Sequence, residues 1–167
     1  MTTAVTISPL EIHVASEFAA AVKRSHSLHY PWVTPPQTEE AVVLLANRRR
    51  GPENYGYVVR RIDSQVLVGY IDITNIIRGV FQSGYLGYYA FSGTERQGYM
   101  TEGLSAVVHY AFNELGLHRL EANIQPENAS SIALVSGVGF IKEGYSSRYL
   151  KLGEHWRDHE RWAILAA

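Results

Sequence analysis

The middle of the chain carries an apolar stripe at helical spacing that any fold must accommodate. The stripe predicts a helix that begins at Thr101 and ends at Gly116, because glycine is typical just past helix C-termini. Its apolar members are Leu104, Val107, Val108, Ala111, Phe112 and Leu115. Residues 83–91 and 119–124, on either side of this helix, are predicted to be strands. A strand, a helix and another strand in succession predict a mixed sheet covered by helices.

The rest of the chain supplies further elements of both kinds. Helical spacing predicts a helix over 12–27, Thr38 caps another that runs to Arg50, and prolines make residues 30–36 a loop. The remaining predicted elements are a helix over 129–138 and strands over 5–8, 55–61, 66–74, 141–150 and 154–165. The order βααβββαβαββ predicts an α/β (α+β) fold, with a mixed central sheet of about seven strands covered by about four helices. We expect a single domain over residues 1–167.

Composition excludes several functional classes. The chain has no cysteine, which removes disulfides, a thiolate nucleophile and cysteine-based metal sites. His155 and His159 lack a metalloprotease pattern. The 15 basic and 16 acidic side chains nearly balance, so no overall field attracts nucleic acid. Without a signal-peptide pattern or a run of about 18 apolar residues, we expect a cytoplasmic protein with no metal, nucleic-acid or membrane partner.

The segment 95–101, ERQGYMT, follows a predicted strand and opens the strongest helix. Free N–H groups at a helix N-terminus, together with the helix dipole, form a site for phosphate. Gly98 lies at the turn and Arg96 can add charge nearby. A single glycine is also common in ordinary strand-to-helix turns. No P-loop or dinucleotide-binding pattern is present, so the neighbouring segments have to decide between a phosphate site and a plain turn.

Four further segments follow this turn in a set order: LHRLEA at 117–122, PENASS at 126–131, GFIKEG at 139–144 and WRDHE at 156–160. Together with the Gly98 turn they resemble the GNAT acetyltransferase superfamily, and within it the RimJ/RimL-like ribosomal-protein-alanine N-acetyltransferases. The family's cofactor loop reads Q/R-x-x-G-x-G/A. Here Gly98 fits the central glycine, whereas Glu95 and Met100 replace the first and last positions.

The resemblance implies acetyl-coenzyme A (acetyl-CoA) as co-substrate. The residues that it assigns to cofactor binding are Tyr89, Ala90, Phe91, Arg96, Gln97, Gly98, Tyr99, Met100, Thr101 and Asn128. A carboxylate at Glu95 would repel a pyrophosphate, so we expect its side chain to point away and main-chain amides to bind. The 88–91 strand is expected to splay from its neighbour and offer amides to the thioester. Gly84 and Gly87, earlier in the predicted strand over 83–91, indicate a bulge or a close approach of the backbone.

The resemblance also implies roles for individual side chains. Ser131 matches a serine that protonates the departing thiolate, although Asn128 and Ser131 also fit helix-capping residues. Trp32 and Tyr88 are expected at the acceptor site, with the alternative that Trp32 is a core anchor. The position of a glutamate base in some family members is Leu150 here. Water-linked bases that remain open are Glu121, His118 and Asp158.

We therefore expect transfer of an acetyl group from acetyl-CoA to a primary amine by direct attack on the thioester. The missing base favours the N-terminal α-amino group of a ribosomal protein, because an α-amine has a reference pKa of about 7.7–8.0 and a lysine about 10.4. A small amine metabolite or antibiotic is the alternative acceptor. A non-catalytic CoA-binding regulatory module is the alternative from another class. The composition also permits a homodimer.

Overall fold

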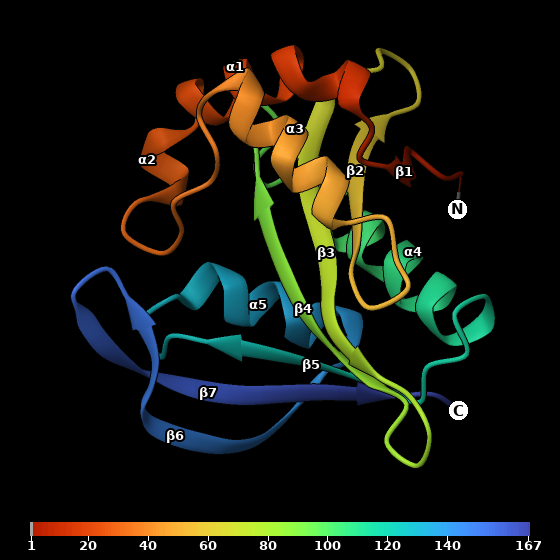
Figure 1. Ribbon diagram of the computed structural model, residues 1–167, viewed down its shortest axis with the longest axis vertical. Coiled ribbons are helices and arrows are strands. Elements are labelled where there is room, and N and C mark those ends of the chain that lie inside the picture. Colours follow the sequence, from red (N-terminus) through yellow and green to blue (C-terminus); the bar gives the residue numbers. More distant parts are fainter. Residues whose placement is uncertain (1) are drawn as a thin grey trace.

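The computed structural model describes residues 2–167 and is built on one seven-stranded mixed sheet (Figure 1). The strand order is β1-β2-β3-β4-β5-β7-β6. The strands are β1 (Val5–Pro9), β2 (Tyr55–Arg61), β3 (Leu67–Ile77), β4 (Ser83–Ala90), β5 (Arg119–Ile124), β6 (Ile141–Leu152) and β7 (His155–Leu165). Within residues 2–167, only the β4–β5 pair is parallel. The predicted mixed sheet is confirmed.

The helices follow the predicted order with one addition. They are α1 (Ala15–Arg24), α2 (His26–His29), α3 (Glu39–Arg48), α4 (Tyr99–Asn113) and α5 (Ala129–Val138), and a 3-10 turn over Ile12–Val14 precedes α1. Among residues 2–167, no helix is both long and apolar enough to cross a bilayer.

The predicted continuous helix over 12–27 is wrong, because the chain breaks at Ser25 between α1 and α2. The Ser25 hydroxyl donates to the Ala21 carbonyl at 2.6 Å and accepts the N–H of Ser92 at 2.9 Å. A serine hydroxyl that bonds backbone groups competes with helix continuation. The break therefore ties the first helical segment to the chain just after β4.

The helices bury the sheet on two faces. On the first face, α4 and α5 pack on a core that includes Ile71 and Ile73. On the second face, α1 and α3 pack on a core that includes Tyr70 and Phe91. Alternation along β3 explains the division, since successive side chains of a strand point to opposite faces. We refer to these as the α4/α5 face and the α1/α3 face.

Helix α4 lies unusually close to the sheet. A Cβ added to Gly103 would stand 2.8 Å from a methyl of Val59 on β2. A Cβ added to Gly69 on β3 would overlap the sulfur of Met100 and lie 2.7 Å from the Tyr89 carbonyl oxygen. These two glycines thus set how near the N-terminal half of α4 comes to β2 and β3.

Strands β4 and β5 pair only at their first residues, Ser83–Tyr85 with Arg119–Glu121. Beyond Tyr85 they diverge, and α5 lies beside the opening (Figure 1). We call this divergence the split. The expected splaying of β4 is present, but no bulge falls at its glycines: the register shift on this side of the sheet lies in β3, between Thr74 and Ile77. Gly87 instead permits a close approach, because a Cβ there would stand 2.6 Å from Asp72 Oδ1.

Candidate active site at the split between β4 and β5

The turn before α4 has the backbone geometry of an anion site. Gly98 is the N-cap residue with φ of 78°, and Arg96 also adopts a positive φ of 59°. The first helical hydrogen bond is the one from the Glu102 N–H to the Gly98 carbonyl, at 3.1 Å. The amides of residues 99–101 precede this bond, so they have no partner within the helix. They and the dipole of α4 are available to a phosphate.

The side chains of Glu95, Tyr99 and Met100 are engaged away from the free amides of this turn. The Glu95 carboxylate accepts the Gly93 N–H at 2.6 Å, on the strand side of the turn. Hydrogen bonds from its own amide and from that of Gly93 lower the pKa of Glu95. The Met100 side chain is directed at Gly69 in the sheet, and the Arg61 guanidinium lies 5.1 Å from the centre of the Tyr99 ring. Arg96, Gln97 and Gly98 are exposed.

The free edge of β4 presents only every second backbone group. The Phe91 N–H donates to the Val68 carbonyl at 2.8 Å, and its ring is fully buried. Because alternate residues of an antiparallel strand bond the same neighbour, the backbone of Tyr89 also faces β3. The amides of Tyr88 and Ala90 face the split. Among the predicted residues 89–91, only Ala90 therefore has its amide toward the split. The amide of Tyr88 also faces the split.

Two predicted site residues meet directly across the split. The Tyr88 hydroxyl, from β4, and the Ser131 hydroxyl, from the first turn of α5, are 2.6 Å apart. Burial raises the pKa of Tyr88 to about 12, so its phenol is protonated at neutral pH. Asn128 is the N-cap of α5, and its Oδ1 accepts the Ser131 N–H at 3.2 Å. The cap uses the Ser131 amide and leaves the hydroxyl to Tyr88.

A buried polar network that the sequence did not predict lies on the α1/α3 face of the sheet, opposite Ser131. Asp72 on β3 accepts from Arg49 Nε at 2.9 Å and from the Tyr70 hydroxyl at 3.2 Å. Burial raises the pKa of Asp72, and the bond from Arg49 opposes that shift. Arg49 belongs to a run of three arginines that the helix dipole alone explains at the end of α3. Only tertiary structure could show that one of them pairs with Asp72.

The loop that carries Trp32 is joined to the end of β4. His29 Nε2 lies 2.7 Å from the Ala90 carbonyl oxygen and therefore donates to it. Burial lowers the pKa of His29, so the ring is neutral at neutral pH. The Trp32 N–H donates to the His29 carbonyl at 2.7 Å, and the Trp32 side chain is half-buried. Trp32 thus lies three residues after His29, which contacts β4, and its role remains a prediction.

The alternative bases are engaged elsewhere or lie at the surface. Asp158 accepts from the Tyr145 hydroxyl and from the Arg148 N–H, while Glu121 pairs with Arg119 at 3.0 Å. His118 is exposed, and Leu150 is 41% exposed. Among residues 2–167, no three His, Asp or Glu side chains gather as a metal site.

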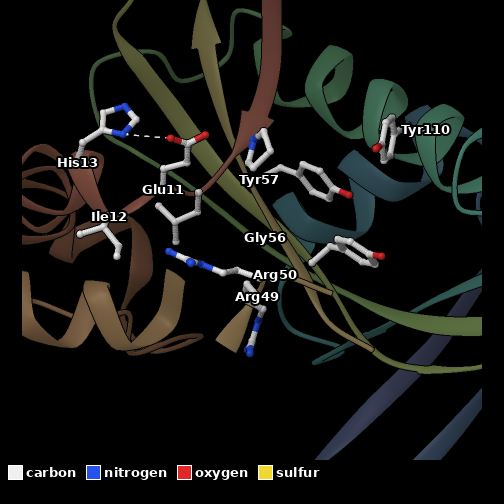
Figure 2. Close-up of a pocket in the computed structure, with 11 residues that line it drawn as sticks. Glu11, Ile12, His13, Arg49, Arg50, Gly56, Tyr57 and Tyr110 are labelled. Carbon is white, nitrogen blue, oxygen red and sulfur yellow. Dashed lines mark ion pairs between the residues drawn. The ribbon is translucent and has the colours of Figure 1, made fainter. Parts of the chain in front are cut away.

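A separate hollow of about 560 Å³ lies away from this site (Figure 2). Tyr57 and Tyr110 line one side of it, and Arg49 and Arg50 the other. None of the predicted site residues lines this hollow.

The family comparison agrees with this geometry. The model of the acetyltransferase (GNAT) domain matches residues 5–141. The chain belongs to the GNAT acetyltransferase family. Enzymes of this family use acetyl-CoA. The structure of Mycobacterium smegmatis RimJ in complex with CoA-disulfide superposes on this GNAT domain with a TM-score of 0.89 and 26% identity, over 97% of this chain and 82% of that one.

Curated relatives are similar over part of their length. The Bacillus subtilis protein named "Probable N-acetyltransferase YjcK" is 37% identical over 113 residues, which is 68% of this chain and 62% of that protein. The [ribosomal protein uS5]-alanine N-acetyltransferase of Escherichia coli is 37% identical over 102 residues, 61% of this chain and 53% of that enzyme. The GNAT chain thus matches less than two thirds of the length of either relative.

Proposed function

We propose that this chain transfers the acetyl group of acetyl-CoA directly to a primary amine. The observation that carries the proposal is the pair of hydroxyls on Tyr88 and Ser131, 2.6 Å apart beside the free edge of β4. In acetyl transfer the sulfur must gain a proton as its bond to the acetyl carbon breaks. Acetyl-CoA, when bound, supplies the activated acetyl carbon and this leaving sulfur.

The residues of the split fit the requirements of that reaction. The amides of residues 99–101 bind pyrophosphate, and those of Tyr88 and Ala90 donate to the thioester oxygen, where negative charge develops. Ser131 gives its proton to the sulfur as the carbon–sulfur bond breaks. The attacking nitrogen loses a proton to solvent as its bond to the acetyl carbon forms, and solvent returns a proton to Ser131, so the step balances. Tyr88 holds the Ser131 hydroxyl in position and stays protonated, because burial raises the pKa of its phenol to about 12. Asn128 fixes the start of α5 and hence the place of Ser131.

The acceptor that we propose is the N-terminal α-amino group of a protein, with a ribosomal protein as the first candidate. Two observations support it. The E. coli relative, at 37% identity, is named for alanine acetylation on ribosomal protein uS5. Position 150, where some family members carry a glutamate base, holds leucine. An α-amine depends less on such a base than a lysine side chain does, because its reference pKa is about 7.7–8.0 and that of lysine about 10.4.

A thiol-release assay with acetyl-CoA tests the proposal against its alternatives. The acceptors are peptides with a free alanine, serine or methionine N-terminus, the same peptides with a blocked N-terminus, spermidine and an aminoglycoside. We expect release with the free peptides and an acetyl group on the first residue by fragmentation mass spectrometry. Turnover of spermidine or aminoglycoside alone would indicate a small-amine enzyme. Tight acetyl-CoA binding without turnover of any amine would indicate a regulatory module.

A further inference from the structure

The last residue of β4, Ala90, has its carbonyl group at the edge of the strand that β5 leaves uncovered. The N–H and C=O of one residue in a β-strand point to the same side, so the Ala90 carbonyl faces the split together with the Ala90 amide. Among residues 2–167 no strand pairs with this edge beyond Tyr85. The carbonyl oxygen therefore needs a donor from outside the sheet, because a backbone acceptor left without a partner away from water is unfavourable.

His29 supplies that donor from α2, which contacts β4. Its Nε2 is 2.7 Å from the Ala90 carbonyl oxygen. A carbonyl oxygen only accepts, so Nε2 carries the ring proton and Nδ1 is left with a lone pair. The rings of Tyr89 and Phe91 stand edge-on to the imidazole, at centroid distances of 5.2 Å and 6.3 Å. These two contacts hold the ring in the orientation that the hydrogen bond requires.

The surroundings of the imidazole confine it to the neutral form. His29 is 4% exposed, and its Nδ1 is buried without a hydrogen-bond partner among residues 2–167. A proton on Nδ1 would place a charged donor where no group accepts it. Burial accordingly lowers the pKa of His29 and His26 adds to the shift, while the bond to the Ala90 carbonyl opposes it. At neutral pH the ring is thus a neutral N–H donor.

The peptide unit that follows Ala90 is bonded at both ends. Its oxygen accepts from His29 at 2.7 Å, and its N–H, that of Phe91, donates to the Val68 carbonyl at 2.8 Å. A peptide unit that is bonded on both sides cannot rotate without breaking one of these bonds. Since the Ala90 amide is joined to this unit through a single Cα, the direction of that amide depends on both bonds.

The hydrogen bond from His29 also changes the electrostatics where the thioester oxygen is proposed to lie. The Ala90 amide is a donor to that oxygen, whereas the Ala90 carbonyl on the same edge carries partial negative charge. An unbonded carbonyl beside an oxygen that gains negative charge in the transition state would raise the energy of that state. The N–H of His29 offsets the charge of the carbonyl and leaves the amide to act on the thioester.

We propose that His29 is a positioning residue for acetyl transfer, whose Nε2–H fixes the Ala90 carbonyl and thereby aims the Ala90 amide at the thioester oxygen. This inference rests on the proposed function and extends the site to α2. His29 acts through the backbone of β4 and exchanges no proton with a substrate.

Variants of His29 test this role in steady-state kinetics. His29→Phe keeps an aromatic ring beside Tyr89 and Phe91 but removes the donor, and His29→Leu replaces it should that variant not fold. We expect kcat to fall about threefold to tenfold, the effect of one hydrogen bond. The KM for acetyl-CoA should stay within about twofold, because the bond matters most as charge develops on the oxygen. His29→Gln, whose side-chain amide can donate to the Ala90 carbonyl, should recover most of kcat.

The matched control is His26→Phe, at an exposed position of the same helix, which should change neither kcat nor KM. Thermal denaturation followed by circular dichroism compares the folding of all variants. We expect them to remain folded with α2 in place, because the Ser92 N–H still donates to the Ser25 hydroxyl, at 2.9 Å, just before this helix.

Two spectroscopic measurements do not depend on turnover. The ring ¹⁵N resonances of His29 in the unliganded protein at pH 7 should show the neutral tautomer with its proton on Nε2. In infrared difference spectra of bound [1-¹³C]acetyl-CoA, the thioester carbonyl stretch should lie below its frequency in solution, since N–H groups polarise the carbonyl. His29→Phe should lose part of this shift and His29→Gln should keep most of it.

The outcomes separate the role of His29 from the reaction. Equal kcat in His29→Phe and wild type, or equal losses in His29→Phe and His29→Gln, would overturn the positioning role while acetyl transfer stands. A ring protonated on Nδ1 at pH 7 would contradict the hydrogen bond itself. A wild type that turns over no amine would instead overturn the proposed function. The infrared comparison of wild type with His29→Phe then still decides whether His29 acts on the thioester carbonyl, because it needs only bound acetyl-CoA.

Discussion

The hydroxyls of Tyr88 and Ser131 share one hydrogen bond, and each depends on a different secondary-structure element. β4 fixes Tyr88 and the N-terminus of α5 fixes Ser131, whose amide is satisfied by Asn128. Because capping uses Ser131 N–H and not its hydroxyl, the capping and proton-donating interpretations of this serine do not exclude each other. The hydroxyl is separable from the cap by mutation.

Removing the hydroxyl of Ser131 should slow turnover without loss of cofactor affinity. We expect Ser131→Ala to lower kcat by about 10²-fold, the size of a general-acid contribution, because the hydroxyl acts as the sulfur departs. Acetyl-CoA binding measured by calorimetry should change little. Ser130→Ala is the matched control, since that exposed hydroxyl bonds only Asn128 Oδ1.

The partner variant Tyr88→Phe should give a smaller loss, and the double variant should be no worse than Ser131→Ala alone. Groups that act as one unit are not additive in mutant kinetics. Full activity in Ser131→Ala would leave this serine only the structural role of its N–H, which Asn128 caps. Additive losses would show that Tyr88 acts on a different atom.

Helix α4 depends on a glycine in its interior for its position against β2. Glycine in the middle of a helix is unfavourable by roughly 0.5–1 kcal/mol relative to alanine. The contact with Val59 explains its presence, since a Cβ at Gly103 would stand 2.8 Å from the valine methyl. This packing sets the distance between the sheet and the N-terminal turn of α4, which carries the amides of residues 99–101.

Gly103→Ala should therefore destabilise the protein in spite of the better helix propensity of alanine. We expect a loss of about 1–3 kcal/mol in the free energy of unfolding, as overpacking of a core typically costs. Urea denaturation of Gly103→Ala, Val59→Ala and the double variant gives a double-mutant cycle. The second substitution should recover part of the loss, and strict additivity of the two losses would refute the contact as the cause.

Periodic elements were predictable from sequence, whereas contacts between distant elements were not. The stripe from Leu104 to Leu115 and the cap at Asn128 are local patterns, and both helices begin within two residues of the prediction. The break at Ser25 depends on Ser92, far along the chain, so spacing alone predicted an unbroken helix.

The candidate site follows the same division. The sequence motifs predicted the Gly98 turn and the position of Ser131 at the start of α5. Both features, a glycine with positive φ and a capped helix start, depend on residues that are neighbours in the sequence. The motifs did not show that the Phe91 amide is used by Val68, since that depends on strand pairing.

The pH dependence of turnover should report the pKa of the acceptor amine. Burial raises the pKa of Tyr88 to about 12, which disfavours the tyrosinate, so this group keeps its proton through about pH 10. The free α-amine attacks only when neutral. We expect kcat/KM for an alanine-initiated peptide to rise with pH to a plateau, with an apparent pKa of about 7.7–8.0.

Initial rates between about pH 6 and pH 10 measure this profile. An N-terminally blocked peptide with one lysine serves as the control and should move the ascending limb toward about 10.4. A descending limb near pH 9 with the alanine peptide would show that the pair of Tyr88 and Ser131 loses its proton earlier than its burial implies.

The separation of β4 and β5 after Tyr85 leaves the Tyr88–Ser131 pair beside an edge of β4 that β5 does not cover. In the proposed transfer the amine attacks acetyl-CoA directly at this opening, so both substrates are bound at once. The chain also has no cysteine to hold the acetyl group between half-reactions. Double-reciprocal plots should accordingly intersect, as in a ternary-complex mechanism, instead of running parallel.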